Sequence, residues 1–107
     1  MKRMLAVAAA GVVLTMLSAH AADSTKTNGW ISDAMCGAKH AGGDMTCAKQ
    51  CLQGGEKPVF VDESKKQVWK IDNPDAVKKF WGDHVTVSAS TDSSKMSVHI
   101  NSIEEAK

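Results

Sequence analysis

The three cysteines of the chain lie within one short stretch, residues 33–51, which reads DAMCGAKHAGGDMTCAKQC. A histidine in the same stretch completes the pattern C-x3-H-x6-C-x3-C, which is made by Cys36, His40, Cys47 and Cys51. Four thiolate and imidazole ligands fit tetrahedral zinc. Soft sulfur ligands also select Cu(I), and the thioethers of Met35 and Met45 lie next to the cysteines. The stretch therefore predicts a Cys3His site for Zn²⁺ or Cu⁺.

The spacing of Cys47 and Cys51 predicts how this site is built. Asp44 is a suitable N-cap for a short helix, and Gly54 is a suitable end for it. On a helix, residues four apart share a face with Cβ atoms ~5–6 Å apart, whereas a disulfide needs ~3.5–4.5 Å. We therefore expect these two cysteines to act as paired ligands, with Cys36 and the histidine approaching from the glycine-containing loop before the helix.

Two other interpretations of the cysteines are open. One is a disulfide from Cys36 to Cys47 or Cys51, which leaves one cysteine free and gives a stapled structural or ligand-binding module. The other is a thiol redox protein, although the sequence lacks the C-x-x-C motif of thiol oxidoreductases. The sequence also shows no Ser-His-Asp arrangement, no carboxylate pair at a recognisable spacing and no phosphate-binding loop. We therefore predict a binding or structural protein rather than an enzyme.

The first residues of the chain have the features of a secretory signal peptide. Lys2 and Arg3 precede an apolar run over residues 4–17, and Ala19 and Ala21 stand in the A-x-A relation of a cleavage site. The run is shorter than the ~20 residues of a membrane-spanning helix. We predict a signal peptide over residues 1–21, no membrane anchor after cleavage, and a periplasmic or secreted protein. Disulfides are permitted in these compartments.

Charge and length limit the partners and the domain count. Without Lys2 and Arg3, eleven basic residues stand against twelve acidic ones, and the lysines alternate with carboxylates along the chain. This balance gives no indication of nucleic-acid binding. The partner predicted from the cysteines and the histidine is a metal ion. The 86 residues that follow the signal peptide suffice for one domain. We expect a flexible lead over residues 22–27 and a single domain over residues 28–107.

Five short runs have the composition or alternation of β-strands. They cover residues 27–33, 57–63, 67–72, 84–90 and 95–103. Between the third and fourth runs, NPDAVKKFWG contains the signals of a helix, with Asn73 as N-cap, Pro74 in the first turn and Gly82 as the stop. This order predicts a mainly β protein with a small OB-like five-stranded barrel. An α+β sheet without barrel closure is the alternative.

The aromatic residues are expected to pack rather than to bind bases. We place them all in the core, with Phe80 and Trp81 of the helix largely buried against the sheet. His84 and His99 fall on the polar faces of their strands and are expected at the surface. A separate weak metal site on neighbouring strands is the alternative for these two histidines. Asp33 and Asp44 flank the cysteines, and turn and capping roles are expected for them.

The runs GWISDAMCGAKH, CAKQC, KPVFV and FWGDHVTVSAS together resemble a group of small exported bacterial proteins of unknown function. The resemblance covers nearly all of the chain after residue 21 and includes a Gly-x-Ile-Ser-Asp-x-x-Cys-Gly opening. It implies an OB-like β-barrel and an importance for Cys36, His40, Cys47 and Cys51. It implies no reaction and no catalytic residue.

Overall fold

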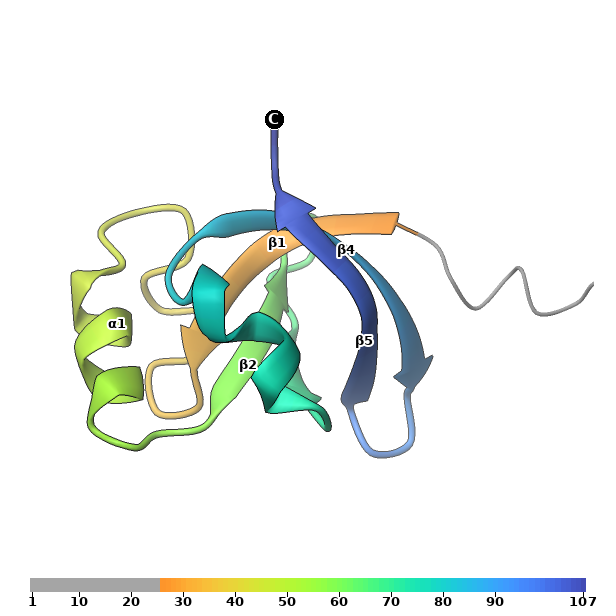
Figure 1. Ribbon diagram of the computed structural model, residues 1–107, viewed down its shortest axis with the longest axis horizontal. Coiled ribbons are helices and arrows are strands. Elements are labelled where there is room, and N and C mark those ends of the chain that lie inside the picture. The colour runs from red at the N-terminus through yellow and green to blue at the C-terminus, as the bar shows by residue number, and fades with distance from the viewer. Residues whose placement is uncertain (1–25) are drawn as a thin grey trace, which may run out of the picture.

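The computed structural model describes residues 26–107, which contain five strands and two helices. In chain order these are β1 (Lys26–Asp33), α1 (Thr46–Gln53), β2 (Pro58–Asp62), β3 (Val68–Ile71), η2 (Pro74–Phe80), β4 (His84–Asp92) and β5 (Ser97–Glu105) (Figure 1). The predicted signal peptide and residues 22–25 of the predicted lead lie outside the described residues. The last two residues of that lead belong to β1, which begins at Lys26.

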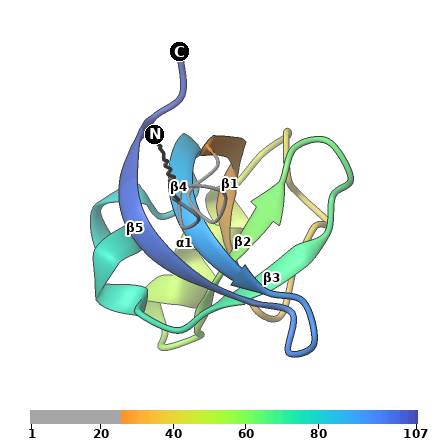
Figure 2. The same ribbon diagram turned by 90° about the vertical axis from the view of Figure 1, so that its right-hand side faces the viewer.

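The strands close into a barrel in the order β1-β2-β3-β5-β4 (Figure 2). Strand β1 closes it because it pairs antiparallel with β4 through residues 26–30 and antiparallel with β2 through residues 29–33, so that Gly29 and Trp30 have partners on both sides. The β3–β5 pair is parallel, since η2 and β4 lie between these strands in the chain. The predicted OB-like barrel, with a cysteine-bearing helix after the first strand and a helix after the third, is confirmed. The open-sheet alternative is excluded.

The barrel core follows the alternation of the strands. Inward-facing residues that are almost fully buried include Ile31, Phe60, Val85, Val87, Val98 and Ile100. Gly29 also faces inward, and a Cβ atom there would lie 2.2 Å from Val61 O and 2.7 Å from the Phe60 ring. The glycine is therefore required for β1 and β2 to approach each other around the phenylalanine.

The prediction that all aromatic residues lie in the core is wrong for Trp30. The side chain of Trp30 lies on the opposite face of β1 from Ile31 and is only partly buried. Its ring stacks on that of His84, with centroids 4.9 Å apart, and the Lys66 ammonium lies 5.2 Å from the ring centroid. Two adjacent strand residues point to opposite faces, so Ile31 and Trp30 cannot both enter the barrel.

The second helix differs from its prediction in type, cap and burial. It is a 3-10 helix, and Asn73 stands at its N-cap position as predicted but makes no capping hydrogen bond with its side chain. The Asn73 side chain instead bonds β5, because its Nδ2 donates to Ile100 O at 2.8 Å and its Oδ1 accepts from Ile100 N at 2.9 Å. Val77 is fully buried, whereas Phe80 and Trp81 are only partly buried against the core. With three residues per turn, Phe80 lies on the same side of the helix as Val77 but one turn further along, and it is only partly covered by the core.

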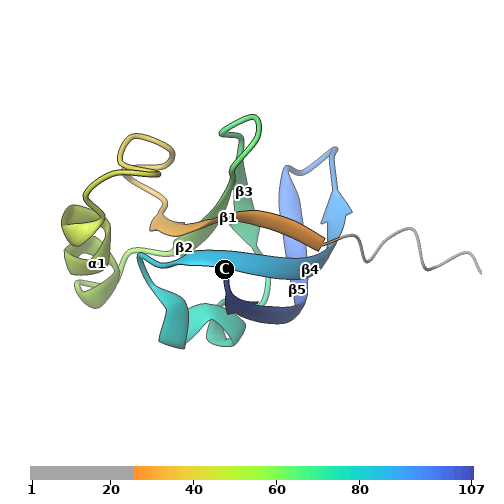
Figure 3. The same cartoon turned by 90° about the horizontal axis from the view of Figure 1, so that it is seen from above.

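Helix α1 lies outside the barrel, beside the ends of β1 and β2 (Figures 1 and 3). Ala48 and Leu52 are its buried residues, and Val59 and Val61 of β2 are buried without belonging to the barrel core. Among the strands, β1 is the one that α1 contacts most. Among the described residues, none of the helices has the length and apolar character needed to cross a membrane.

Candidate metal centre

Cys36, Cys47 and Cys51 meet at one point outside the barrel. Their Sγ atoms all lie within 4.8 Å of one another, and no disulfide joins them. The Cys36 and Cys47 sulfur atoms are 3.9 Å apart. The Cys47 side chain is exposed, while the other two are half-buried. The three sulfur atoms thus form a compact group that is open to solvent on one side.

The Asp33 carboxylate fixes the loop that carries Cys36. Asp33 is fully buried at the end of β1, and its Oδ2 accepts hydrogen bonds from Met35 N and Cys36 N, both at 3.0 Å. Its carbonyl accepts from Gly37 N at 2.8 Å, and Gly37 has a φ of +54°. The predicted turn role of Asp33 is therefore confirmed. The turn reverses the chain directly after the strand and brings the Cys36 thiol toward α1.

Helix α1 supplies the other two sulfur atoms from one of its faces. Cys47 and Cys51 are four residues apart on it, as predicted from their spacing. The Asp44 carboxylate supports the start of the helix, since its Oδ1 accepts from Thr46 N at 2.9 Å and from Thr46 Oγ1 at 2.6 Å. These bonds lower the pKa of Asp44. The residue at the N-cap position is Met45, so Asp44 acts one residue earlier than predicted.

The surroundings of the sulfur atoms favour neutral thiols when no metal is bound. Hydrogen bonding of the protonated Cys36 thiol to the Asp33 carboxylate, followed by burial and by repulsion between that carboxylate and a thiolate, raises the pKa of Cys36 to about 12. Burial of the side chain is the largest cause of the raised pKa of Cys51. Asp33 Oδ1 is buried and accepts no hydrogen bond of normal geometry from a described residue, so it is the oxygen available to a nearby thiol proton. A cation that replaces these protons would also be attracted by the carboxylate.

His40 is not brought into the sulfur group. It lies in the loop between Cys36 and α1, and the ligand atoms found within 4.8 Å of one another belong to the three cysteines. The His40 carbonyl accepts from Gly43 N at 2.9 Å in a turn that keeps the residue in the loop. The role of His40 as a fourth ligand stays a prediction.

The two methionines near the cysteines have different surroundings. Met35 is 74 % exposed and is the large apolar side chain that the described surface leaves most open to solvent. Met45 is 8 % exposed and stands at the N-cap position of α1. Of the two thioethers, Met35 is therefore the one free to move toward the sulfur group.

Trp30 supports the far end of the cysteine loop, a role that the sequence did not reveal. Gly42 has a φ of +87°, and a side chain added there would lie 3.4 Å from the Trp30 ring. The loop therefore rests on the outer face of β1, next to the stacked ring of His84. A tryptophan between a glycine and an isoleucine in a strand indicates that the ring is buried. It does not indicate which side of the sheet buries it.

The surface positions predicted for His84 and His99 agree with the structure. His84 Nε2 lies 2.9 Å from Glu63 Oε1, and His99 Nδ1 lies 2.7 Å from Asp72 Oδ1. Each pairs with its own carboxylate, and the two histidines do not form a metal-ligating group within residues 26–107.

Comparison with known proteins adds no relative. No family model, no curated protein and no solved structure matches the chain. The resemblance to small exported bacterial proteins therefore stays a prediction, and the site is interpreted from its own geometry: three cysteines that lie close together and could hold one metal ion.

Proposed function

We propose that this chain is an exported metal-binding protein that holds one soft metal ion between the thiolates of Cys36, Cys47 and Cys51. The observation that carries the proposal is the convergence of three sulfur atoms within 4.8 Å. In a tetrahedral site with metal–sulfur bonds of ~2.3 Å, two sulfur ligands are ~3.8 Å apart. The Cys36–Cys47 separation of 3.9 Å matches this value, so small side-chain rotations suffice to bind an ion.

Cu(I) is the preferred ion and Zn(II) the second choice. Thiolate and thioether ligands select Cu(I), and the group contains three sulfur atoms with the exposed thioether of Met35 nearby in the chain. Zinc needs a fourth ligand for a closed structural site. That ligand would be a water molecule or the His40 ring, which would require the loop over residues 37–43 to change conformation.

The position of the site favours a carrier over a structural metal. The barrel has its own apolar core, and the sulfur atoms lie outside it on α1 and the preceding loop. Metal binding is therefore not needed to fold the barrel, in contrast to small domains that unfold without zinc. The exposed Cys47 gives the thiols of another molecule access to the ion.

Export is supported by the sequence of residues 1–21. The basic start, the apolar run and the alanines at positions 19 and 21 make Ala22 the expected first residue of the mature protein. Intact mass of protein recovered from the periplasm or medium checks this. A mass that still includes residues 1–21 would contradict export by cleavage.

A disulfide-stapled module is the second candidate, because the 3.9 Å between the Cys36 and Cys47 sulfur atoms also brings them near bonding distance. A bond of ~2.05 Å would require the two side chains to approach further. It would leave Cys51 as the free thiol. In an oxidising compartment this form competes directly with metal binding.

The test is a titration of fully reduced protein with Cu(I) and, separately, Zn(II), each against a chelator of known affinity. We expect one equivalent to bind, and we expect Cys36→Ser, Cys47→Ser and Cys51→Ser each to weaken Cu(I) binding by at least about a hundredfold. Ser64→Ala, a change far from the cysteines, serves as the control and should bind normally. Loss of two of the three free thiols on oxidation, with no metal retained by reduced protein, would support the stapled module instead.

A further inference from the structure

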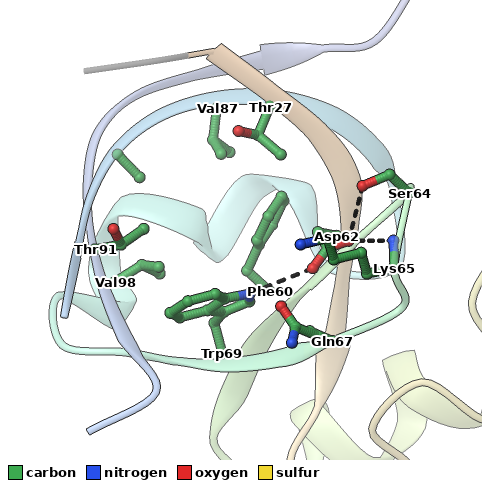
Figure 4. Close-up of a pocket in the computed structure, with 11 residues that line it drawn as sticks. Thr27, Phe60, Asp62, Ser64, Lys65, Gln67, Trp69, Val87, Thr91 and Val98 are labelled. Atoms are coloured by element: carbon green, nitrogen blue, oxygen red, sulfur yellow. Dashed lines mark hydrogen bonds between the residues drawn. The ribbon is translucent and has the colours of Figure 1, made fainter. Parts of the chain in front are cut away.

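A second site lies at the end of the barrel away from the cysteines. The cysteine segment joins the last residue of β1 to the first of β2, whereas a pocket of about 260 Å³ opens between Thr27 near the start of β1 and Asp62 at the end of β2. Figure 4 shows this opening, with side chains from all five strands and from the β2–β3 loop around it. Helix η2 contacts β5 and packs Val77 against the core, and no residue of η2 is among those that line the opening.

The inner wall of the pocket is apolar and aromatic. Phe60 and Trp69 are cross-strand partners on β2 and β3, and both rings face the opening (Figure 4). Val87 and Val98 complete this wall from β4 and β5 and are almost fully buried. Trp69 is only partly buried, so part of its ring is available to a bound molecule.

Asp62 places a carboxylate inside this apolar wall. Its side chain is 7 % exposed. Oδ1 accepts from Lys65 N at 2.6 Å and from Ser64 Oγ at 3.4 Å, and Oδ2 accepts from Trp69 Nε1 at 3.4 Å. No lysine, arginine or histidine of residues 26–107 forms an ion pair with it. A buried carboxylate without a cationic partner is costly, and Oδ2 has only one long hydrogen bond, so it retains capacity to accept another.

We propose that this pocket binds a small organic cation, namely a primary ammonium or amidinium group attached to a flat apolar body. The cationic group would donate to Asp62 Oδ2, while the body would lie against Trp69 and Phe60, where a cation also gains from the aromatic faces. The volume lies just below the ~300–1,000 Å³ of pockets for drug-sized ligands. The occupant is therefore of the size of an aromatic monoamine.

The Lys65 ammonium has the same charge as the proposed ligand and could compete with it for Asp62. It is the cation among the residues that line the pocket, but it is exposed and forms no ion pair with a described residue. Its long stem lets the ammonium turn to solvent when another cation enters. Glu63 lies next to the loop and pairs with His84, so it does not offset Asp62.

The test compares three probes of similar size on the reduced, metal-free protein: tryptamine, neutral indole-3-ethanol and anionic indole-3-propionate. Two-dimensional amide spectra report where each binds. We expect tryptamine to shift the signals of Asp62, Trp69 and Val87 and to bind at least about tenfold more tightly than the neutral probe, because hydrogen bonds between charged groups are the stronger ones. The anion should bind least.

Two variants separate this site from the general surface. Asp62→Asn keeps the shape and should remove the preference for tryptamine, while Asp72→Asn, a matched change outside the pocket, should leave it intact. Thr91→Arg adds a cation at the exposed rim and should also weaken tryptamine binding, which keeps the test informative if Asp62→Asn is unstable. Equal affinities for the three probes, shifts confined to other residues, or no saturation below about 10 mM would overturn the proposal. Copper binding is measured separately, so its failure would leave this inference unaffected.

Discussion

At the scale of single residues, the acidity of the cysteines decides how the site behaves. The Asp33 carboxylate raises the pKa of Cys36 to about 12, and burial raises the pKa of Cys51. Both thiols are therefore protonated near neutral pH, while a metal ion binds the thiolates. Each bound ion must displace protons, so affinity depends on pH.

The sign of this dependence follows directly. A thiol whose pKa lies far above the working pH loses one proton on binding, and affinity then rises tenfold per pH unit for each proton released. We expect Cu(I) to bind at least about a hundredfold more tightly at pH 8 than at pH 6. Competition titrations with a chelator corrected for its own protonation measure this. A flat profile would show that the thiols are already ionised in the free protein.

Asp33→Asn is the matched variant for this mechanism. The amide oxygen can keep the hydrogen bonds from Met35 N and Cys36 N, but the negative charge beside the thiol is removed. We expect the pKa of Cys36 to fall and its alkylation by iodoacetamide at pH 8 to become faster. Asp44→Asn, on the other side of the cysteines, should leave the Cys36 rate unchanged. A slower reaction in Asp33→Asn would contradict the role of the carboxylate.

His40→Ala distinguishes the two candidate metals. If three sulfur atoms are sufficient for Cu(I), the variant should bind Cu(I) within about threefold of the original protein. If Zn(II) uses the imidazole as its fourth ligand, Zn(II) affinity should fall by about 10–100-fold or more. Parallel titrations with the two metals check this. A loss of Cu(I) affinity as large as that from Cys47→Ser would show that the histidine is a ligand of both ions.

The convergence of the three cysteines could be predicted because their relation is local. Two of them follow from helical spacing, and the third stands at the Asp-x-x-Cys turn that ends a strand. His40 depends instead on a loop whose path is set by Gly37 and Gly42 at positive φ, and no periodicity describes such a path. Asp62 could not be distinguished from an ordinary turn residue, because its burial depends on the closure of the barrel.

At the scale of elements, η2 shows how tertiary contacts override a local signal. The sequence before Pro74 has the residue type of an N-cap, yet the Asn73 amide pairs with both backbone groups of Ile100. This side chain extends the pairing of β5 and anchors the segment that follows β3. Strand positions were predicted to within a few residues because alternation is local, whereas the partner of one asparagine 27 residues away is not.

Asn73→Ala should therefore lower the free energy of unfolding by more than the removal of a helix cap would. It leaves the N–H and C=O of Ile100 without these partners, and we expect a loss of about 1–3 kcal/mol in the free energy of unfolding. Asn101→Ala is the control, since Asn101 is exposed and donates to the side-chain oxygen of Ser90 at 3.2 Å rather than to strand backbone. Urea denaturation of both variants measures the difference. Equal stability of the two would show that the bond to β5 contributes little.

At the scale of the whole molecule, the barrel holds the cysteine group and the Asp62 pocket at opposite ends. One end of β1 leads into the cysteine loop and α1, while the other borders the pocket around Asp62. Closure was predicted from the order of the elements, but an open sheet would have had the same alternation. The pairing of β1 with both β2 and β4 decides between them.

Gly29→Ala tests the close packing on which closure depends. A Cβ atom would lie 2.2 Å from Val61 O, so the two strands would have to separate. We expect a loss of about 3 kcal/mol or more. Gly54→Ala is the control, because its nearest neighbours would lie 3.5 Å away and the residue has an ordinary φ of −83°. Thermal melts compare the two, and a melting temperature of Gly29→Ala equal to that of Gly54→Ala would contradict the close approach.

The most direct test of the metal site is X-ray absorption at the copper edge of reduced protein loaded with one equivalent of Cu(I) and then desalted. The convergence of Cys36, Cys47 and Cys51 predicts that copper is retained with a first shell of three sulfur atoms, and that Cys51→Ser reduces this number to two. A shell made mainly of nitrogen or oxygen atoms, or copper lost on desalting, would contradict a three-thiolate metal site.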